Sequence, residues 1–162
     1  MLRVLVTSFT LVSLCVVIHT IGLVLLAHWL IRHRPTAESE FSIGRFSMLL
    51  NSVFGVIVLL HLIETLVWAA FYDLCSLFGD FETSWYFSLG SYTTIGYGDV
   101  VLPAKWRMLG GLEGITGVLL CGLSTAFLFG VVNEMFESRA RQHSARSKRA
   151  VSPAAREGEI KE

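Results

Sequence analysis

The sequence is poor in charge and in cysteine. Charged residues make up 16% of its 162 positions, and the formal net charge is zero. The cysteines, Cys15, Cys75 and Cys121, are odd in number and far apart. They therefore form neither a metal-binding spacing nor a disulfide framework. We expect free thiols, and the alternative is a bridge between subunits at Cys75.

The sequence also lacks the motifs of an enzyme. Its serine, histidine and cysteine residues are scattered through apolar segments, and no glycine-rich nucleotide-binding loop is present. We therefore expect no enzymatic activity, no cofactor and no nucleic-acid partner.

Hydrophobic residues, in contrast, are abundant. They make up 53% of the sequence, and the mean hydropathy is +0.60. Three apolar runs, residues 4–31, 46–72 and 104–136, are long enough to cross a bilayer, which needs about 20 residues. The first run is longer than a signal-peptide core of about 7–15 residues, so we expect it to be retained. The sequence predicts an all-α membrane protein with four segments: a first transmembrane helix (1–31), a loop (32–45), a central domain (46–136) and a basic tail (137–162).

Basic residues are placed unevenly along this plan. The 32–45 segment contains three arginines, and seven more Lys or Arg residues follow Phe136. The 73–84 segment has three acidic residues and no basic one. Because basic loops stay on the cytoplasmic side, we expect the N-terminus outside and the C-terminus in the cytoplasm. The tail is either a disordered extension or a frayed helix near anionic membrane lipid.

The most informative motif is TTIGYGD at residues 93–99. Gly96 and Gly98 tolerate a positive φ, so successive backbone carbonyls can turn to one side. A ring of such carbonyls can replace the water shell of a potassium ion. Residues 84–93 precede the motif and are too short to span a membrane. They predict a re-entrant helix that is capped by Thr83 or Ser84.

This motif, between two apolar runs, resembles the selectivity filter of potassium channels of the two-helix pore-loop superfamily. The resemblance covers about residues 46–136: an outer helix (46–72), a pore helix (84–93), a filter (94–99) and an inner helix (104–136). The additional first helix resembles small prokaryotic members, which implies the inner membrane of a bacterium. One filter per chain implies a homotetramer.

The resemblance also implies roles for individual residues. Potassium would bind to the carbonyls of Thr94, Ile95, Gly96 and Tyr97 and to the Thr94 hydroxyl, in the strand that ends at Gly98. Tyr97 would point away from the pore and pack against the aromatic side chains of the pore helix, Trp85 and Tyr86. The C-terminal end of that helix would face the central cavity, where its partial negative charge favours a cation.

One position departs from the family pattern. Many members carry a polar residue, often Glu, four positions before the filter threonine, where it braces the Asp of the motif. Here that position is Gly90, which has no side chain to brace Asp99, although the hydroxyl of Tyr86 can reach it. We expect Glu64 or Glu113, both intramembrane carboxyl groups, to replace the brace or to pair with a donor of the pore helix. The alternative is an ordinary interhelical hydrogen bond.

Histidines also occur in the apolar runs. His61 lies three residues before Glu64, so the two share a helix face and can pair. This leaves a pH-sensitive role behind the filter open. His19 is most simply a helix-packing residue.

The inner helix should line a central cavity at helical spacing, with an acidic residue at its cytoplasmic end. The expected residues are Leu119, Gly122, Ala126, Phe127, Gly130 and Glu134. Phe127 either closes the pore as an apolar ring or faces a neighbouring helix. Gly117 and Gly122 are either hinges or packing positions.

The sequence thus predicts a tetrameric, potassium-selective channel that conducts passively in contact with membrane lipids. The alternative is a channel-like structural or regulatory membrane subunit that does not conduct. No span carries the regularly spaced arginines of a voltage sensor, so the gating stimulus stays open.

Overall fold

The computed structural model describes residues 2–33 and 43–159, and every regular element in those ranges is helical. The predicted all-α class is therefore confirmed. The elements are α1 (Leu2–Arg32), α2 (Ile43–Leu74), α3 (Phe81–Tyr92), the short 3-10 helix η1 (Ala104–Trp106) and α4 (Arg107–Glu159). Most of the expected 32–45 loop, including Arg34, lies outside the described residues, as do residues 160–162.

Three segments are long and apolar enough to cross a membrane: Leu2–Arg32, Ile43–Leu74 and Ala104–Arg141. Many of their large apolar side chains face outward. Phe9 and Ile115, for example, are 75% and 58% exposed. Water would disfavour such continuous apolar faces, whereas lipid or another subunit would not.

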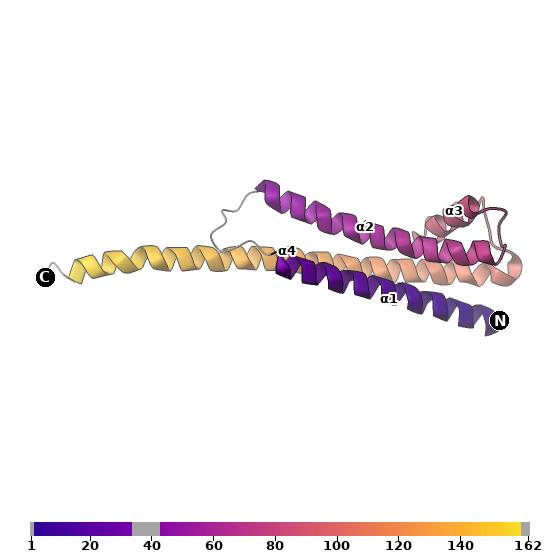
Figure 1. Cartoon of the computed structure of the whole chain (residues 1–162), viewed down its shortest axis with the longest axis horizontal. Coiled ribbons are helices and arrows are strands. Elements are labelled where there is room, and N and C mark those ends of the chain that lie inside the picture. The colour runs from indigo at the N-terminus through magenta and orange to yellow at the C-terminus, as the bar shows by residue number, and fades with distance from the viewer. Residues whose placement is uncertain (1, 34–42, 160–162) are drawn as a thin grey trace.

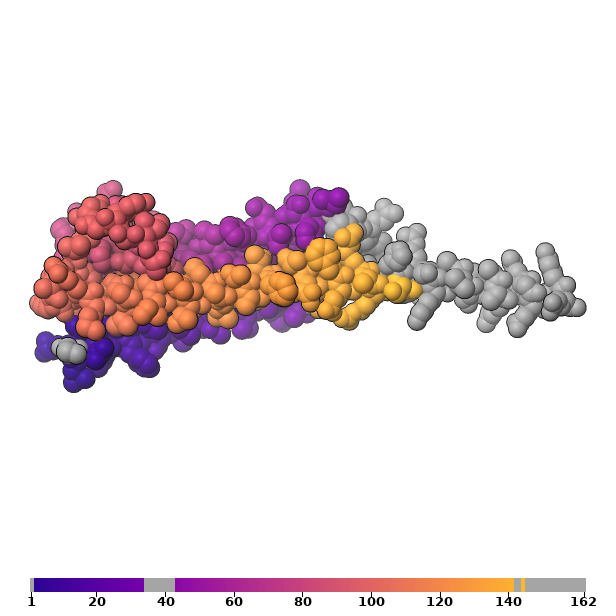
Figure 2. Space-filling view, turned by 180° about the vertical axis from the view of Figure 1, so that it is seen from behind, coloured from indigo at the N-terminus to yellow at the C-terminus, as the bar shows by residue number. Residues whose placement is uncertain are grey.

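The long helix α4 runs through the whole molecule, with α2 on one side and α1 on the other (Figures 1 and 2). The short helix α3 lies at the end where α1 begins, and the C-terminus lies at the opposite end (Figure 1). Buried apolar side chains form two clusters. One includes Trp68, Tyr72 and Tyr92, and the other includes Val53 and Leu60.

The start of α3 corrects the sequence expectation. The N-cap is Asp80, not Thr83 or Ser84, and its Oδ1 accepts a hydrogen bond of 2.7 Å from the backbone N–H of Thr83. An aspartate at this position pairs an orphan amide and also places negative charge at the positive end of the helix. The same hydrogen bond lowers the pKa of the Asp80 carboxyl group.

The last helix also differs from expectation at both ends. It begins at Arg107, after η1, rather than at residue 104, because Pro103 precedes the 3-10 turn instead of entering the helix. It continues past residue 136 to Glu159. The tail was expected to be either a disordered extension or a frayed helix, and the structure shows helix. Glu137 and Arg141 favour it by forming an ion pair of 2.8 Å one turn apart.

The end of α3 packs against α4 at two glycines. A Cβ added at Gly114 would lie 3.0 Å from the carbonyl oxygen of Ser91, and one added at Gly117 would collide with the backbone carbonyl of Tyr92. The C-terminal end of α3 therefore rests directly on the α4 backbone. Of the two roles considered for Gly117, the structure supports close packing rather than a hinge.

We predict that Gly117→Ala destabilises the protein, because the added methyl group forces α3 away from α4. The expected loss is about 1–3 kcal/mol, as for overpacking of a core. Thermal unfolding in detergent micelles, followed by tryptophan fluorescence, measures it. Gly111→Ala is the matched control on the same helix, since nothing lies within 4 Å of its added Cβ. Equal stability of the two variants would contradict this packing.

Candidate functional site

The segment that follows α3 has an alternating backbone. Thr94, Gly96 and Gly98 have φ values of 61°, 50° and 80°, while Ile95 and Tyr97 are not among the residues with positive φ. The positive φ expected at both glycines is confirmed. The left-handed conformation of Thr94 was not expected, because an L-residue with a branched side chain rarely adopts it.

Two backbone hydrogen bonds tie this segment to the end of α3. The N–H of Thr94 donates to the carbonyl of Ser91, and the N–H of Gly96 donates to the carbonyl of Gly90, both at 3.0 Å. Gly90 was expected to have no side chain that braces Asp99, and its contribution is made by the backbone instead. Its side chain is absent, but its carbonyl is one of the orphan acceptors at a helix C-terminus and holds the filter backbone directly.

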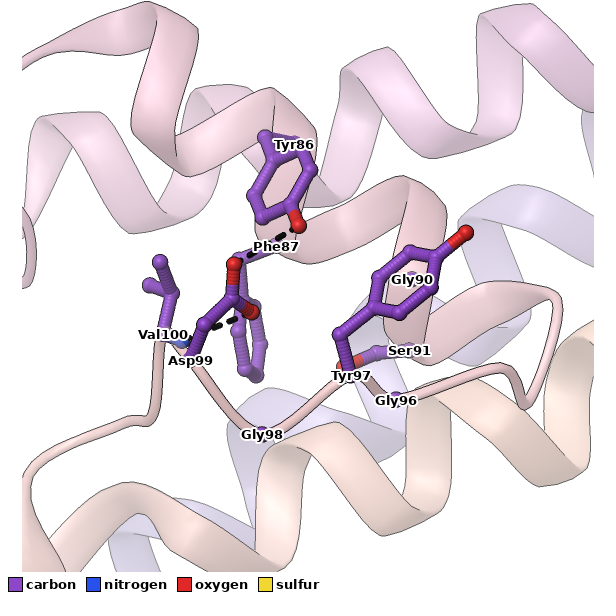
Figure 3. A pocket seen from close by; sticks show the side chains of 9 residues that line it. All are labelled: Tyr86, Phe87, Gly90, Ser91, Gly96, Tyr97, Gly98, Asp99 and Val100. Carbon is purple, nitrogen blue, oxygen red and sulfur yellow. Dashed lines mark hydrogen bonds between the residues drawn. The ribbon is translucent and has the colours of Figure 1, made fainter.

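A small cavity of about 30 Å³ lies beside Gly90, between α3 and the loop formed by Gly96 to Val100 (Figure 3). Its volume suits an ordered water molecule. The Tyr86 hydroxyl donates a hydrogen bond of 2.8 Å to Asp99 Oδ2, which confirms that predicted contact. This hydrogen bond lowers the pKa of the Asp99 carboxyl group, so the group stays ionised.

The rings of Tyr86 and Tyr97 stack at 6.4 Å between centroids, 10° from parallel (Figure 3). Trp85 was expected to pack beside Tyr97. Within this chain it instead donates its Nε1–H to the Thr65 hydroxyl on α2, at 3.2 Å. It therefore fixes α3 to the outer helix.

Glu113 lies buried on α4 and contacts hydroxyl groups from two other helices. The Tyr72 hydroxyl lies 2.7 Å from Oε2, and the Ser88 hydroxyl lies 2.5 Å from Oε1. Ser88 belongs to α3, so Glu113 pairs with a pore-helix group, one of the two roles expected for it. The other expected role was to brace Asp99. Glu113 contacts Tyr72 and Ser88, and the residue that braces Asp99 is Tyr86.

The contacts of Ser88 specify the protonation of Glu113. The Ser88 oxygen lies 2.5 Å from Glu113 and 2.8 Å from the carbonyl oxygen of Thr65, yet the hydroxyl has one proton. Both contacts are hydrogen bonds only when Glu113 is a carboxylic acid that donates to Ser88. A neutral carboxyl group also avoids the cost of an unpaired charge in an apolar interior.

Glu64 is the second buried carboxyl group. It is fully buried on α2, with His61 Nδ1 at 3.2 Å, which confirms the predicted pairing on one helix face. It also contacts His19 Nδ1 on α1 at 2.8 Å and the Tyr92 hydroxyl on α3. No pattern in the sequence predicted the His19 contact, because His19 and Glu64 lie on different helices and meet only through tertiary packing.

The expected cavity-lining stripe is divided in the structure. Leu119, Gly122, Ala126 and Gly130 are exposed on α4, as is Glu134. Phe127 packs instead against the cluster formed by α1 and α2. The expectation of a Phe127 gate is thus replaced by its alternative, a side chain that faces neighbouring helices.

Comparison with known proteins places part of the chain in a family. Residues 60–134 match the family model described as an ion channel. The match covers the second half of α2, all of α3, residues 93–99 and the first half of α4, so this part of the chain is similar to an ion-channel domain. Together with the three apolar helices, it makes the chain a multi-pass membrane protein. No curated protein and no solved structure matches the chain.

We predict that Tyr86→Phe raises the pKa of Asp99 towards its ordinary value, because the donor that stabilises the carboxylate is lost. The group then takes up a proton at a higher pH than in the unmodified protein. Carboxyl ¹³C chemical shifts across a pH titration measure it. Asp80 is the internal control, since its bond partner is Thr83. An unshifted Asp99 titration would refute the role of this bond.

We predict that Glu113→Gln leaves stability nearly unchanged and that Glu113→Ala lowers it. Glutamine keeps a donor for Ser88 and an acceptor for Tyr72. Alanine leaves the Tyr72 hydroxyl without its acceptor, at about 1–3 kcal/mol, and leaves Ser88 only its bond to Thr65. Thermal unfolding in micelles compares the two. If glutamine destabilises as much as alanine, Glu113 is an ionised carboxylate and the proton assignment is wrong.

Proposed function

We propose that the protein is a potassium-selective channel that conducts passively down the electrochemical gradient. The observation that supports this most is the alternating left-handed backbone at Thr94, Gly96 and Gly98, held at the end of a short helix inside a channel domain. Such alternation turns consecutive carbonyls towards one side, and rows of carbonyl oxygens are the ligands that replace the hydration shell of potassium. The ion ligands would be the carbonyls of residues 94–97 and the Thr94 hydroxyl.

The working unit of this proposal is a homotetramer. A single strand supplies only one side of an ion path, so several copies must surround it. The exposure of the filter supports this, because Ile95 and Tyr97 are 58% and 72% exposed in one chain. The exposed α4 stripe of Leu119, Gly122 and Ala126 offers a second surface for neighbouring copies or for the cavity. Phe129, which is 72% exposed, shares this helix face.

The proposal includes an orientation in the membrane. The distribution of basic residues favours a cytoplasmic C-terminus and an outside N-terminus. The filter mouth, with the ionised Asp99, would then face the outside, and Glu134 would lie towards the inner mouth. Both carboxyl groups would raise the local concentration of cations. The exposed apolar faces of the three spans would contact membrane lipids.

Flux through the purified protein in liposomes tests this function. We predict potassium flux that barium blocks, without sodium flux under the same gradient. Gly96→Ala should abolish the flux, because alanine disfavours the φ of 50° at that position. Gly79→Ala is the matched control, since its added Cβ meets nothing within 4 Å. A folded tetramer without potassium flux at any voltage would instead identify a non-conducting channel-like subunit.

A further inference from the structure

A closed ring of side chains lies where the four α-helices meet behind the filter. Going round it, Glu64 contacts His19 Nδ1 at 2.8 Å, and His19 Nε2 contacts the Ser124 hydroxyl at 3.0 Å. Ser124 contacts His61 Nε2 at 3.1 Å, and His61 Nδ1 contacts the Tyr92 hydroxyl at 2.8 Å. The Tyr92 hydroxyl then returns to Glu64.

The ring has a definite number of protons. Its five contacts need five protons, one for each. An ionised glutamate, two neutral imidazoles and two hydroxyls supply only four. All contacts are hydrogen bonds when one further proton is present, on Glu64 or on an imidazole. With the proton on Glu64, every group donates to one neighbour and accepts from the other; with the proton on an imidazole, that imidazolium donates twice and the Glu64 carboxylate accepts twice. The ring carries no net charge in either case.

No basic residue replaces that proton. The chain has no Lys or Arg between Arg3 and Arg32, between Arg45 and Lys105, or between Arg107 and Arg139. The other titratable groups around the ring are thiols. Cys121 on α4 lies 3.9 Å from His61 Nε2, and the buried Cys15 lies one turn before His19 on α1.

The ring reaches the filter through Tyr92. This residue ends α3, directly before the motif at residues 93–99, and its backbone carbonyl rests on Gly117 of α4. The Tyr92 hydroxyl, at the other end of the residue, is held by the ring through His61 and Glu64. His19 is the only member contributed by α1, and it is fully buried.

We propose that His19 is a positioning residue through which α1 holds the base of the filter, by closing this single-proton ring on Tyr92. The proposal rests on the channel function argued above. It assigns a structural role to α1, the helix that lies outside the pore domain. Removing a donor from the ring makes an acceptor face an acceptor, so one contact opens and the base of the filter loosens.

A metal ion is the competing occupant of this site. His19, His61 and Glu64 are ligand types for zinc, and their ligand atoms lie within 4.8 Å of one another. Their nitrogen and oxygen atoms are, however, already at hydrogen-bond distances from each other or from Ser124 and Tyr92. The ring accounts for every one of these contacts without an ion.

Two variants separate the parts of the proposal. Glu64→Gln supplies an amide donor on one side and a carbonyl acceptor on the other, so all five contacts are satisfied at any pH with neutral imidazoles. His19→Phe keeps the ring volume but removes both bonds to α1. His28→Phe is the matched control, because His28 is an exposed histidine on the same helix.

Two readouts are measured from pH 6 to pH 10 on each full-length variant. One is the potassium-to-sodium flux ratio in liposomes. The other is hydrogen–deuterium exchange of residues 93–98, which does not require conduction. Relative to the unmodified protein, we expect His19→Phe to lower the flux ratio about fivefold and to raise exchange about fivefold, as for one lost buried hydrogen bond. Glu64→Gln should be constant at the protected level, and His19→Phe constant at the loosened level.

Three results would overturn the proposal. The first is exchange in His19→Phe that follows the His28→Phe control at every pH. The second is exchange in Glu64→Gln as fast as in His19→Phe. The third is a change in exchange on adding micromolar zinc to the unmodified protein, absent from Glu64→Gln, which would assign the site to a metal. Absence of all flux with the expected exchange pattern would reject the channel function and retain the ring.

Discussion

A polar group buried in an apolar interior must be paired or neutral, and this constraint fixes the position of α3. No Lys or Arg lies between Arg45 and Lys105 or between Arg107 and Arg139, the stretches that contain the buried carboxyl groups of Glu64 and Glu113. Each carboxyl group instead bonds to a hydroxyl of α3, at Tyr92 and Ser88 respectively. The short helix is thereby held at two points one turn apart, on its buried side, by α2 and α4.

The backbone of the filter follows from that placement. The last carbonyls of α3 have no partner inside the helix, and those of Gly90 and Ser91 accept from the amides of Gly96 and Thr94. These bonds pull the chain back on itself, which requires left-handed residues. Close contact between α3 and α4 is needed at the same place, and Gly117 provides it by having no side chain. The left-handed backbone conformation of residues 94–98 is therefore maintained by the packing of α3 against α4, and not by residues 94–98 alone.

The sequence predicted what depends on local chemistry. The left-handed conformation of Gly96 and Gly98 was expected, since it follows from glycine in a recognisable motif. The bond between His19 and Glu64 was not, because 45 positions separate them and no periodicity connects two different helices. The orientation of Phe127 was left open for a related reason. Helical spacing shows which residues share a face, but only packing decides which face meets α1 and α2.

Neutral networks behind the filter also have an electrostatic consequence. A lone carboxylate close to a dehydrated cation would compete with the backbone carbonyls, because Coulomb energies are large where water is excluded. With Glu113 protonated and the Glu64 ring uncharged, as inferred above, neither network would add a net charge beside the proposed ion path. The field along the path is then set by the carbonyl dipoles, by the C-terminal end of α3 and by ionised Asp99 at the mouth. In the proposed channel, the same hydrogen bonds that position α3 would thus leave the ion path under the control of its backbone.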